Sequence, residues 1–394
     1  MSKVAVVKTQ DQSYESIKKA VDQVIEQIGG LEDIIKPGYK VIIKPNLVAC
    51  PTDRLSGGIT RWEVCLAIYE AVQAVGGVPV IAESSAAGAD TELTIAKCGY
   101  QELRDKGIPV IDLKNKENAR CVMPVEDGVV FDKINTWELV RDADAIITVP
   151  VMKTHDQTEI TLGLKNLKGL LTDVQKKDFH KQGLIEGVVD WCKTLKPVLE
   201  IVDGTFGQQG LGPIFGETKE IIGSKDLVAC EAVTGKIMGY EPEEVMITEA
   251  AHKRGMGEMD LKKIEVVGKQ IEEVASRFKR SSEVTIEGIP TSFNLIFSKD
   301  ACTGCHNTVI SALMDMKAQD LFLYLENMNV CVGPCTKEHL PEGANAENTV
   351  CVGICAKKLA DEMGFRWVVG CPPGNADVVK GVLGDRKEYG VRYS

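Results

Sequence analysis

The sequence lacks long apolar runs and an excess of basic residues. No window approaches the roughly eighteen uncharged apolar residues that a membrane-spanning helix needs, and residues 1–30 lack the apolar core of a signal peptide. The 57 acidic residues outnumber the 46 basic ones, which gives a formal charge of −11. Phosphate contacts need a basic surface. We therefore expect a cytoplasmic protein that binds neither membranes nor nucleic acids.

Several nucleotide and catalytic motifs are also missing. No GxGxxG follows a predicted strand in the required way, and no GxxxxGK[ST] occurs, so neither a standard dinucleotide site nor a Walker site is expected. GxSxG and HExxH are absent as well, which argues against hydrolases with a nucleophile elbow and against zinc metalloproteases.

The first 270 residues alternate short β-branched runs with amphipathic stretches. The predicted strands are residues 4–8, 41–48, 78–85, 108–113, 145–151, 197–204 and 263–268, with helices predicted between the first three. This alternation indicates an α/β fold with a mainly parallel sheet. A chain of 394 residues with 44% apolar and 26% charged residues has the composition of a soluble protein of two or three domains.

A domain boundary is predicted at residues 271–292, where charges, small polar residues and a proline are mixed. The core would then cover residues 1–270, either as one unit or as two subdomains. Residues 293–394 contain four short hydrophobic runs and three helical stretches, which predict a smaller α/β domain.

Cysteine is concentrated in this smaller domain. Seven of the thirteen cysteines lie there: Cys302, Cys305, Cys331, Cys335, Cys351, Cys355 and Cys371. Cys302 and Cys305 form a CxxC, and VCVGPC is followed by the similar VCVGIC. Thiolates at such spacings hold iron–sulfur clusters. Seven ligands exceed one zinc site, and they suffice for one 4Fe–4S cluster and for a second that has an open iron or a ligand such as His306.

The leading cluster ligands are predicted to be Cys302, Cys305, Cys351 and Cys371, followed by Cys331, Cys335 and Cys355. Cys371 has additional support because Pro372-Pro373-Gly374 exposes backbone and a helix follows.

Three other interpretations of the cysteines stay open. Disulfides suit small secreted domains, but this chain is long and has no signal peptide. A zinc site could use Cys302, Cys305 and two later cysteines, because CxxC pairs also bind zinc. Two or three cysteines could also be small buried hydrophobic residues, since Val-Cys-Val is typical of a strand interior.

Polar residues follow the predicted core strands, at the sheet edge where ligands bind in α/β folds. Residues 152–169 are the richest segment: Lys153, His155, Lys165 and Lys168 are cationic, and Thr154 and Asn166 are neutral hydrogen-bonding partners. Lys44 and Asn46 could close the same pocket. Such a set suits a carboxylate or phosphate. His155 could act as a general acid or base, whereas Lys176, Lys177 and Lys181 are expected to be surface charges.

Residues 203–216 read DGTFGQQGLGPIFG, with five glycines that disfavour a helix. We expect a loop here that brings backbone close to a ligand, with a plain surface loop as the alternative.

The segments VIIKPNLV, PVMKTH, TLGLKNLKG and DGTFGQQGLGP closely resemble the family called domain of unknown function 362, over about residues 38–240. The resemblance implies an iron–sulfur cluster-binding protein of an anaerobe or archaeon, with a core similar to nickel-dependent lactate racemase. Carried over by position, its motif residues are Lys44, Asn46, Lys153, Thr154, His155, Lys165, Asn166, Lys168, Gly169 and Asp203. The ferredoxin run CxxCxxCxxxC found in many members is missing, which leaves the cluster type and number open.

These observations predict an iron–sulfur oxidoreductase that acts on a small anionic substrate. His155, Lys153 and Lys165 are the catalytic candidates, and Lys44, Asn46, Thr154, Asn166, Lys168 and Asp203 the anion-binding ones. The alternatives are an electron carrier for a redox protein partner, a racemase-like enzyme, and a zinc protein. Oligomers are compatible with all four.

Overall fold

Most strands of the first 270 residues form one large sheet in the computed structural model, which describes residues 1–51, 53–212, 214–387 and 389. The sheet order is β12-β1-β11-β10-β7-β2-β3-β4, and β8 pairs with both β10 and β9. Most pairs are parallel, whereas β1–β11, β10–β11 and β8–β9 are antiparallel. The predicted α/β fold with a mainly parallel sheet is therefore confirmed.

The strands of this core are β1 (Ser2–Lys8), β2 (Lys40–Pro45), β3 (Val78–Glu83), β4 (Val110–Asp112), β7 (Ala145–Val149), β8 (Val151–His155), β9 (Glu159–Thr161), β10 (Leu199–Gln208), β11 (Ile214–Ser224) and β12 (Ile264–Gly268), with a separate hairpin of β5 (Arg120–Pro124) and β6 (Lys133–Trp137). The helices are α1 (Tyr14–Gln27), α2 (Trp62–Ala74), α3 (Thr91–Lys97), α4 (Gln101–Asp105), α5 (Glu138–Arg141), α6 (Gly163–Asn166), α7 (Asp173–Gln182), α8 (Leu184–Leu195), α9 (Leu227–Ile237), α10 (Met246–Lys253) and α11 (Ile271–Val274).

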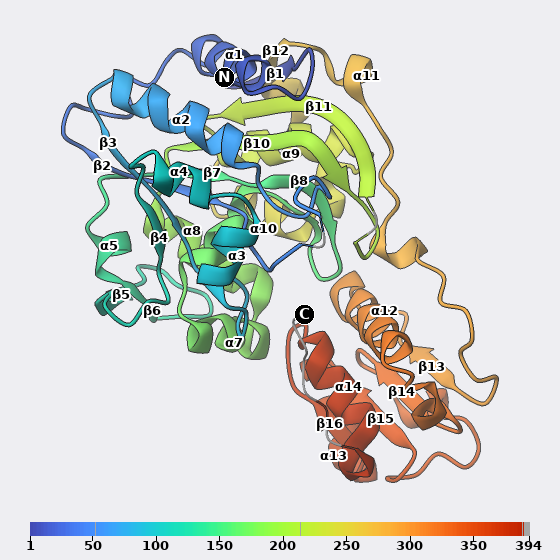
Figure 1. Cartoon of the computed structure of the whole chain (residues 1–394). Coiled ribbons are helices and arrows are strands. Elements are labelled where there is room, and N and C mark those ends of the chain that lie inside the picture. Colours follow the sequence, from blue (N-terminus) through green and yellow to red (C-terminus); the bar gives the residue numbers. More distant parts are fainter. Residues whose placement is uncertain (52, 213, 388, 390–394) are drawn as a thin grey trace.

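Both faces of the core sheet are covered by helices, as Figure 1 shows. Successive side chains of a strand point to opposite faces, so Ile42 packs with the cluster of α6 to α10, while its neighbours Val41 and Ile43 pack with α1 and α2. The middle of a strand such as β2 is hydrophobic at successive positions for this reason. The N-terminus of α1 is capped by Ser13, whose side chain accepts a hydrogen bond from Ser16 N.

The glycine-rich segment predicted as a loop is largely a β-hairpin, so this prediction was wrong for most of its length. β10 continues to Gln208 and β11 begins at Ile214. The pairing register shifts between Gly204 and Phe206 and between Gly207 and Gln208. Such bulges absorb glycines that would weaken a regular strand.

The C-terminal unit has a four-stranded parallel sheet in the order β13-β14-β15-β16, formed by Asn294–Phe297, Asn329–Val332, Thr349–Val352 and Arg366–Val368. Its helices are α12 (Thr303–Ala318), α13 (Lys357–Met363) and α14 (Asn375–Leu383). This unit agrees with the predicted smaller α/β domain; residues 388 and 390–394 at its predicted end lie outside the described residues.

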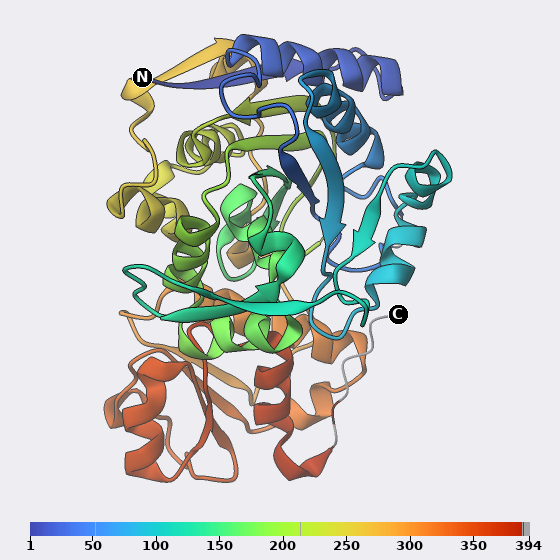
Figure 2. The same ribbon diagram turned by 90° about the vertical axis from the view of Figure 1, so that its left-hand side faces the viewer.

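The connection between the two sheets runs from Gly268 to Asn294 and partly packs on the core. Phe278 is buried and stacks on Phe215, with ring centroids 4.1 Å apart. Ser281 Oγ donates a hydrogen bond to Gly210 O at 2.9 Å. Figures 1 and 2 show the C-terminal unit, in orange and red, on one side of the core, beside α7. Within the described residues, no helix combines the length and the apolarity that crossing a membrane requires.

Candidate functional site

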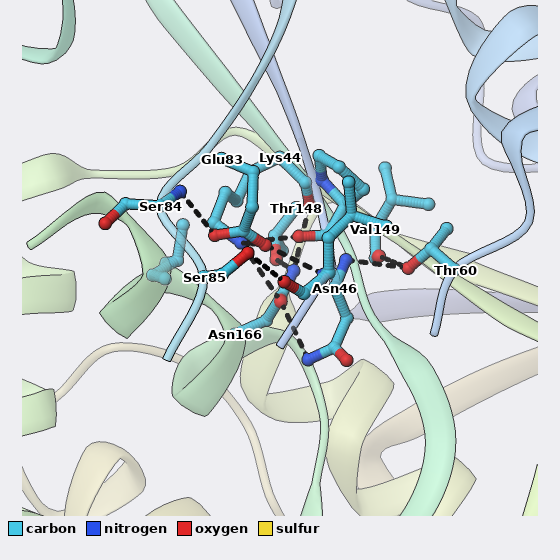
Figure 3. Close-up of polar contacts among 12 residues, drawn as sticks. Lys44, Asn46, Thr60, Glu83, Ser84, Ser85, Thr148, Val149 and Asn166 are labelled. Atoms are coloured by element: carbon cyan, nitrogen blue, oxygen red, sulfur yellow. Dashed lines mark hydrogen bonds and ion pairs between the residues drawn. The ribbon is translucent and has the colours of Figure 1, made fainter. Parts of the chain in front are cut away.

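Lys44 lies at the end of β2 and is fully paired within the core (Figure 3). Only 1% of this residue is exposed, and its Nζ lies 2.8 Å from Glu83 Oε2 and 3.4 Å from Asn166 Oδ1. Burial lowers the pKa of Lys44, which Glu83 partly offsets. A buried ion pair of this kind has little charge left for a ligand, so the predicted anion-binding role of Lys44 does not fit the structure.

Gly169 is required by the close packing over this ion pair. A Cβ atom at this position would lie 2.3 Å from Glu83 Oε1 and 2.5 Å from Lys44 Nζ. Leu47 N and Ser84 N also donate to the Glu83 carboxylate, at 2.8 and 2.7 Å. Lys44, Gly169 and Asn166 of the motif therefore hold neighbouring strand ends of the core sheet together.

Asn46 and Asn166 join this ion pair to the next lysine. Asn46 Nδ2 donates to Asn166 Oδ1 at 3.3 Å, and Lys153 Nζ donates to Asn46 Oδ1 at 2.9 Å. Asn166 Nδ2 donates to Lys44 O and to Thr148 Oγ1. Because both amides are buried and bonded to protein groups, they position the lysines and do not face a ligand.

Lys153 differs from Lys44 because no carboxylate of the described residues lies within ion-pair distance of its Nζ. Its protein partners are two carbonyl oxygens, Asn46 Oδ1 at 2.9 Å and Gly58 O at 2.8 Å. Only 7% of the residue is exposed. Burial, and then the nearby charge of Lys165, lower the pKa of Lys153 to about 7.

Two lysine–histidine pairs lie next to Lys153. Lys165 Nζ is 2.8 Å from His155 Nε2, and Lys168 Nζ is 2.5 Å from His180 Nε2. Burial lowers the pKa of all four groups: that of Lys165 falls to about 8, and that of His155 falls to about 4 with a further contribution from Lys165. His180 Nδ1 is buried without a hydrogen-bonding partner in the described structure.

We call Lys153, His155, Lys165, Lys168 and His180 the cationic cluster. Asp156 is the carboxylate that lies among these groups, with Oδ1 3.0 Å from His155 Nδ1. Burial opposes its ionisation, but His155 and Lys165 more than offset this and lower the pKa of Asp156 to about 2. Five groups that can carry positive charge thus face one carboxylate, so either several stay neutral or an anion joins them.

Two further motif residues have structural roles. Thr154 Oγ1 donates to Gly210 O at 2.9 Å. The buried Asp203 carboxylate accepts hydrogen bonds from Arg61 N, Thr205 N and Thr205 Oγ1. Both predicted anion-binding roles therefore lack a free group in this structure.

Lys177 and Lys181 are exposed, as predicted, but the prediction for Lys176 was wrong. Lys176 is buried, and its Nζ donates to Ser84 O at 2.6 Å, Ser84 Oγ at 2.7 Å and Ser85 O at 2.6 Å. The sequence shows no difference between these three lysines of α7, because only the position of the β3 end decides which of them is covered.

Four cysteines from three separate segments gather on the side of the C-terminal unit that faces the core. We call Cys302, Cys305, Cys355 and Cys371 the interface thiol group. The side chains of Cys302 and Cys305 share a hydrogen bond, and Cys371 and Cys355 lie close enough to raise the pKa of Cys305. Cys302 and Cys355 are exposed, Cys371 is half-buried and Cys305 is buried.

The other three cysteines, Cys331, Cys335 and Cys351, form an inner thiol group. Cys331 and Cys351 are paired in register on β14 and β15, and the Cys331 side chain hydrogen-bonds with those of Cys335 and Cys351. All three are buried and pack in an apolar cluster beneath α13 with Leu359, Phe365 and others. Cys331 and Cys351 thus lie within strands, as the buried-hydrophobic interpretation expects, and not at strand ends.

The structure changes one member of the leading ligand set predicted from the sequence. Cys355 lies with Cys302, Cys305 and Cys371, whereas the predicted Cys351 lies with the inner thiol group. None of the thirteen cysteines forms a disulfide. Within the described part of the chain, no three cysteine, histidine or acidic side chains already stand in the arrangement of metal ligands. The two groups are neighbouring free thiols.

Backbone and side-chain bonds fix the interface thiol group to the core. Cys371 N donates to His180 O, and Leu184 N donates to Cys371 O, both at 2.8 Å. Gln157 Nε2 reaches from the β8–β9 turn to Pro373 O at 2.8 Å and to Thr308 Oγ1 at 3.1 Å. Cys371 is therefore held directly against the helix that carries His180 of the cationic cluster.

A cavity of about 430 Å³ lies on another side of Lys153. Its described lining residues are Val48, Ala49, Cys50, Pro51, Asp53, Ser56, Gly58, Ile59, Lys153, Gln208 and Gly212. Lys153 is the one lysine among them. The approach of the residue 50–58 loop to the hairpin depends on Gly57, whose φ is +72° and where a Cβ would lie 2.6 Å from Gly207 backbone atoms.

Reasoning from the sequence singled out Lys153, His155, Lys165 and Lys168 but missed Asp156, Gln157 and His180. Asp156 and Gln157 directly follow the KTH segment, so their position was a signal. His180 had none, because it lies on a separate helix and reaches the site only through the packing of α7.

Two known proteins are similar to this chain. The thylakoid-associated protein sll1697 of Synechocystis sp. is 29% identical over 258 residues, covering 62% of this chain and 78% of that protein. The lactate racemase apoprotein from Thermoanaerobacterium thermosaccharolyticum is 12% identical, covers 97% of this chain and 90% of its own, and superimposes with a TM-score of 0.40, too low to support an argument. Residues 41–236, which contain β2, Lys44, the cationic cluster and the glycine hairpin, match the protein family described as domain of unknown function (DUF362).

Proposed function

We propose that this chain is an iron–sulfur oxidoreductase that acts on a small anionic substrate. The observation that carries the proposal is the position of the interface thiol group, whose four members come from three separate segments and meet against the helix of His180. Four thiols at one place are the usual donor set of a 4Fe–4S cluster. Cys302, Cys305, Cys355 and Cys371 would hold it.

A 4Fe–4S cluster, when bound, supplies a one-electron redox couple. The chain itself would keep this group at a fixed place relative to the substrate. Cys371 is bonded on both sides to the turn between α7 and α8, and Gln157 joins the β8–β9 turn to α12 and to the segment after Cys371. Rigid positioning of this kind is what transfer between two bound groups requires.

The cationic cluster supports an anionic substrate. Lys165 and Lys168 are half-buried, and Asp156 is the carboxylate among them. An anion close to these groups would stabilise their protonated forms, and charge-assisted hydrogen bonds in such a place are about twice as strong as neutral ones. The cavity beside Lys153 has room for a small molecule.

The alternative functions have less support in the structure. An electron carrier without a substrate would be favoured if Lys153 and Lys165 pointed apart into solvent, but Lys153 is buried, Lys165 is half-buried, and Lys165 lowers the pKa of Lys153. A racemase-like enzyme needs a pair of bases around His155, and it would be excluded if a His155→Gln variant kept full turnover. A second cluster, held by the inner thiol group, would be a further outcome of the iron analysis described below.

Anaerobic purification, followed by iron and acid-labile sulfide analysis and electron paramagnetic resonance, tests the proposal. About four irons per chain are expected for one such cluster. About eight would mean that the inner group also holds a cluster. Zinc in place of iron, or no metal in protein prepared and reconstituted under anaerobic conditions, would contradict the iron–sulfur function.

A further inference from the structure

We propose that Lys153 is a nucleophilic amine that forms an imine with a small 2-oxo acid bound in the adjoining cavity. The inference deepens the proposed function by naming a substrate class for the same site, and it rests on that function for the location of the substrate but not for the metal.

The first argument is the stereochemistry of the amine. A neutral amine has two N–H groups and one lone pair. Lys153 Nζ donates to Asn46 Oδ1 at 2.9 Å and to Gly58 O at 2.8 Å. Because both N–H groups donate to carbonyl oxygens, the lone pair of Nζ points in the remaining direction and is not used by these two hydrogen bonds. Lys153 also lines the cavity of about 430 Å³, so a bound molecule can reach the amine.

The second argument is that the surroundings keep this amine unprotonated. No carboxylate of the described residues is within ion-pair distance of Nζ, whereas Lys44 on the neighbouring strand end is paired with Glu83 at 2.8 Å. Lys165 adds a positive field. Burial beside a second cationic group is a known way to make a lysine nucleophilic at neutral pH.

The third argument concerns the substrate. The amine calls for a carbonyl carbon, and the positive charge of Lys165 near Lys153 favours a ligand that also carries a carboxylate. A 2-oxo acid has both groups on adjacent carbons. The hydroxyl and amide groups of Ser56 and Gln208 in the cavity lining can bond its other oxygens, while Asp53 in the same lining disfavours ligands with a second carboxylate there.

The reaction balances without an oxidant or reductant. Lys153 Nζ attacks the carbonyl carbon and forms a C–N bond. The amine gives up one N–H proton and the carbonyl oxygen takes up one proton, which gives a carbinolamine. Loss of this hydroxyl with the second N–H proton releases water and leaves a C=N bond. Protonation of the imine nitrogen would make the adjacent carbon more electrophilic, in keeping with an enzyme that acts on this substrate.

Borohydride trapping tests the inference. The full-length protein is incubated with pyruvate at pH 7.5, treated with sodium borohydride and mapped by peptide mass spectrometry. Lys153 is expected to carry the reduced adduct at least about tenfold more than the exposed Lys177, because Lys153 lines the cavity and its lowered pKa leaves much of its amine free at pH 7.5. An adduct distributed evenly over the lysines, or none at Lys153, would overturn the inference.

A Lys153→Arg variant removes the nucleophilic amine, so trapping at this position must be lost, whereas the Lys177→Arg control must still be labelled at Lys153. The comparison of Lys153 with Lys177 is made in the unsubstituted protein, so it does not require that either variant fold. Iron is counted in the same samples. If Lys153 is trapped in protein that cannot bind iron, the iron–sulfur function is wrong and the imine proposal holds. If the protein binds iron but Lys153 is not trapped, the imine proposal is wrong and the iron–sulfur function holds.

Discussion

The cationic cluster of the core and the interface thiol group of the C-terminal unit are opposite in their chemistry. In the first, Lys153, Lys165 and Lys168 gather with two histidines around Asp156. In the second, four free thiols gather without a basic residue among them. One region holds a single carboxylate, Asp156, among five groups that can carry positive charge, and the other consists of thiols that become anions when they bind a metal.

The two regions also meet each other. Cys371 bonds to the backbone of His180, so the thiol group and the cationic cluster share one helix end. Buried like charges are unfavourable by themselves, whereas free thiols carry no charge until they bind a metal. The proposed function accounts for this difference with an anion at the cationic cluster and an iron–sulfur cluster at the interface thiol group.

The largest effect is expected from removing an interface thiol. Cys302→Ser and Cys371→Ser should lose most of the bound iron after anaerobic purification, because a 4Fe–4S cluster needs all its ligands. Iron and sulfide analysis measures this. Cys121→Ser, at a half-buried cysteine on β5, is the matched control and should keep its iron. Unchanged iron in both interface variants would show that this group is not the ligand set.

The unpaired state of Lys153 predicts a pH-dependent stability. Its pKa is about 7 in the folded protein and near 10.5 in the unfolded chain, so between these values the unfolded state binds more protons and stability rises with pH. The Lys153→Met variant lacks this slope. Relative to the unsubstituted protein, its free energy of unfolding should fall by on the order of 3 kcal/mol between pH 7 and pH 9.5, as measured by urea denaturation.

Lys44→Met is the matched comparison for this experiment. It removes the partner of the buried Glu83 carboxylate, which should destabilise the protein by about 3 kcal/mol or more at pH 7. If the Lys153→Met variant kept the rise of stability with pH seen in the unsubstituted protein, Lys153 would be paired in solution, and the contrast between the two lysines would be lost.

The contact between the two regions should contribute less. Gln157→Leu leaves Pro373 O and Thr308 Oγ1 without their interdomain partner and should cost about 2 kcal/mol of stability. Gln101→Leu, at an exposed position on α4, serves as control and should stay within about 0.5 kcal/mol. If Gln157→Leu behaves like the control, the two units do not depend on this bond.

The smallest effect is expected in the inner thiol group. Cys351→Ala removes one buried sulfur from an apolar cluster, which should cost about 1 kcal/mol and leave the iron content unchanged. Thermal unfolding and iron analysis of the same sample measure both. A large loss of iron would restore Cys351 to the ligand set that the sequence favoured and would assign the metal to the inner group.

Most of the fold was predictable because it depends on local periodicity. Runs such as 41–43 and 145–147 are apolar and buried at each position, as strands covered on both faces must be. The strands β8, β9 and β11 were not predicted, because polar or glycine-rich residues such as Lys153, Glu159 and Gly216 interrupt their pattern. Their pairing depends on long-range contacts that the pattern does not encode.

The sequence by itself determined that this is an α/β chain, that seven of its thirteen cysteines lie between residues 302 and 371, and that residues 152–169 concentrate cations. Only the tertiary structure decided which groups meet. VCVGPC and VCVGIC are nearly identical, yet Cys335 turns inward beside Cys331 while Cys355 turns outward beside Cys305. Likewise Lys44 meets Glu83 and Lys153 meets two carbonyl oxygens. The physical reason is that pairing depends on which distant strand end or turn lies within about 3 Å, and local composition does not fix this.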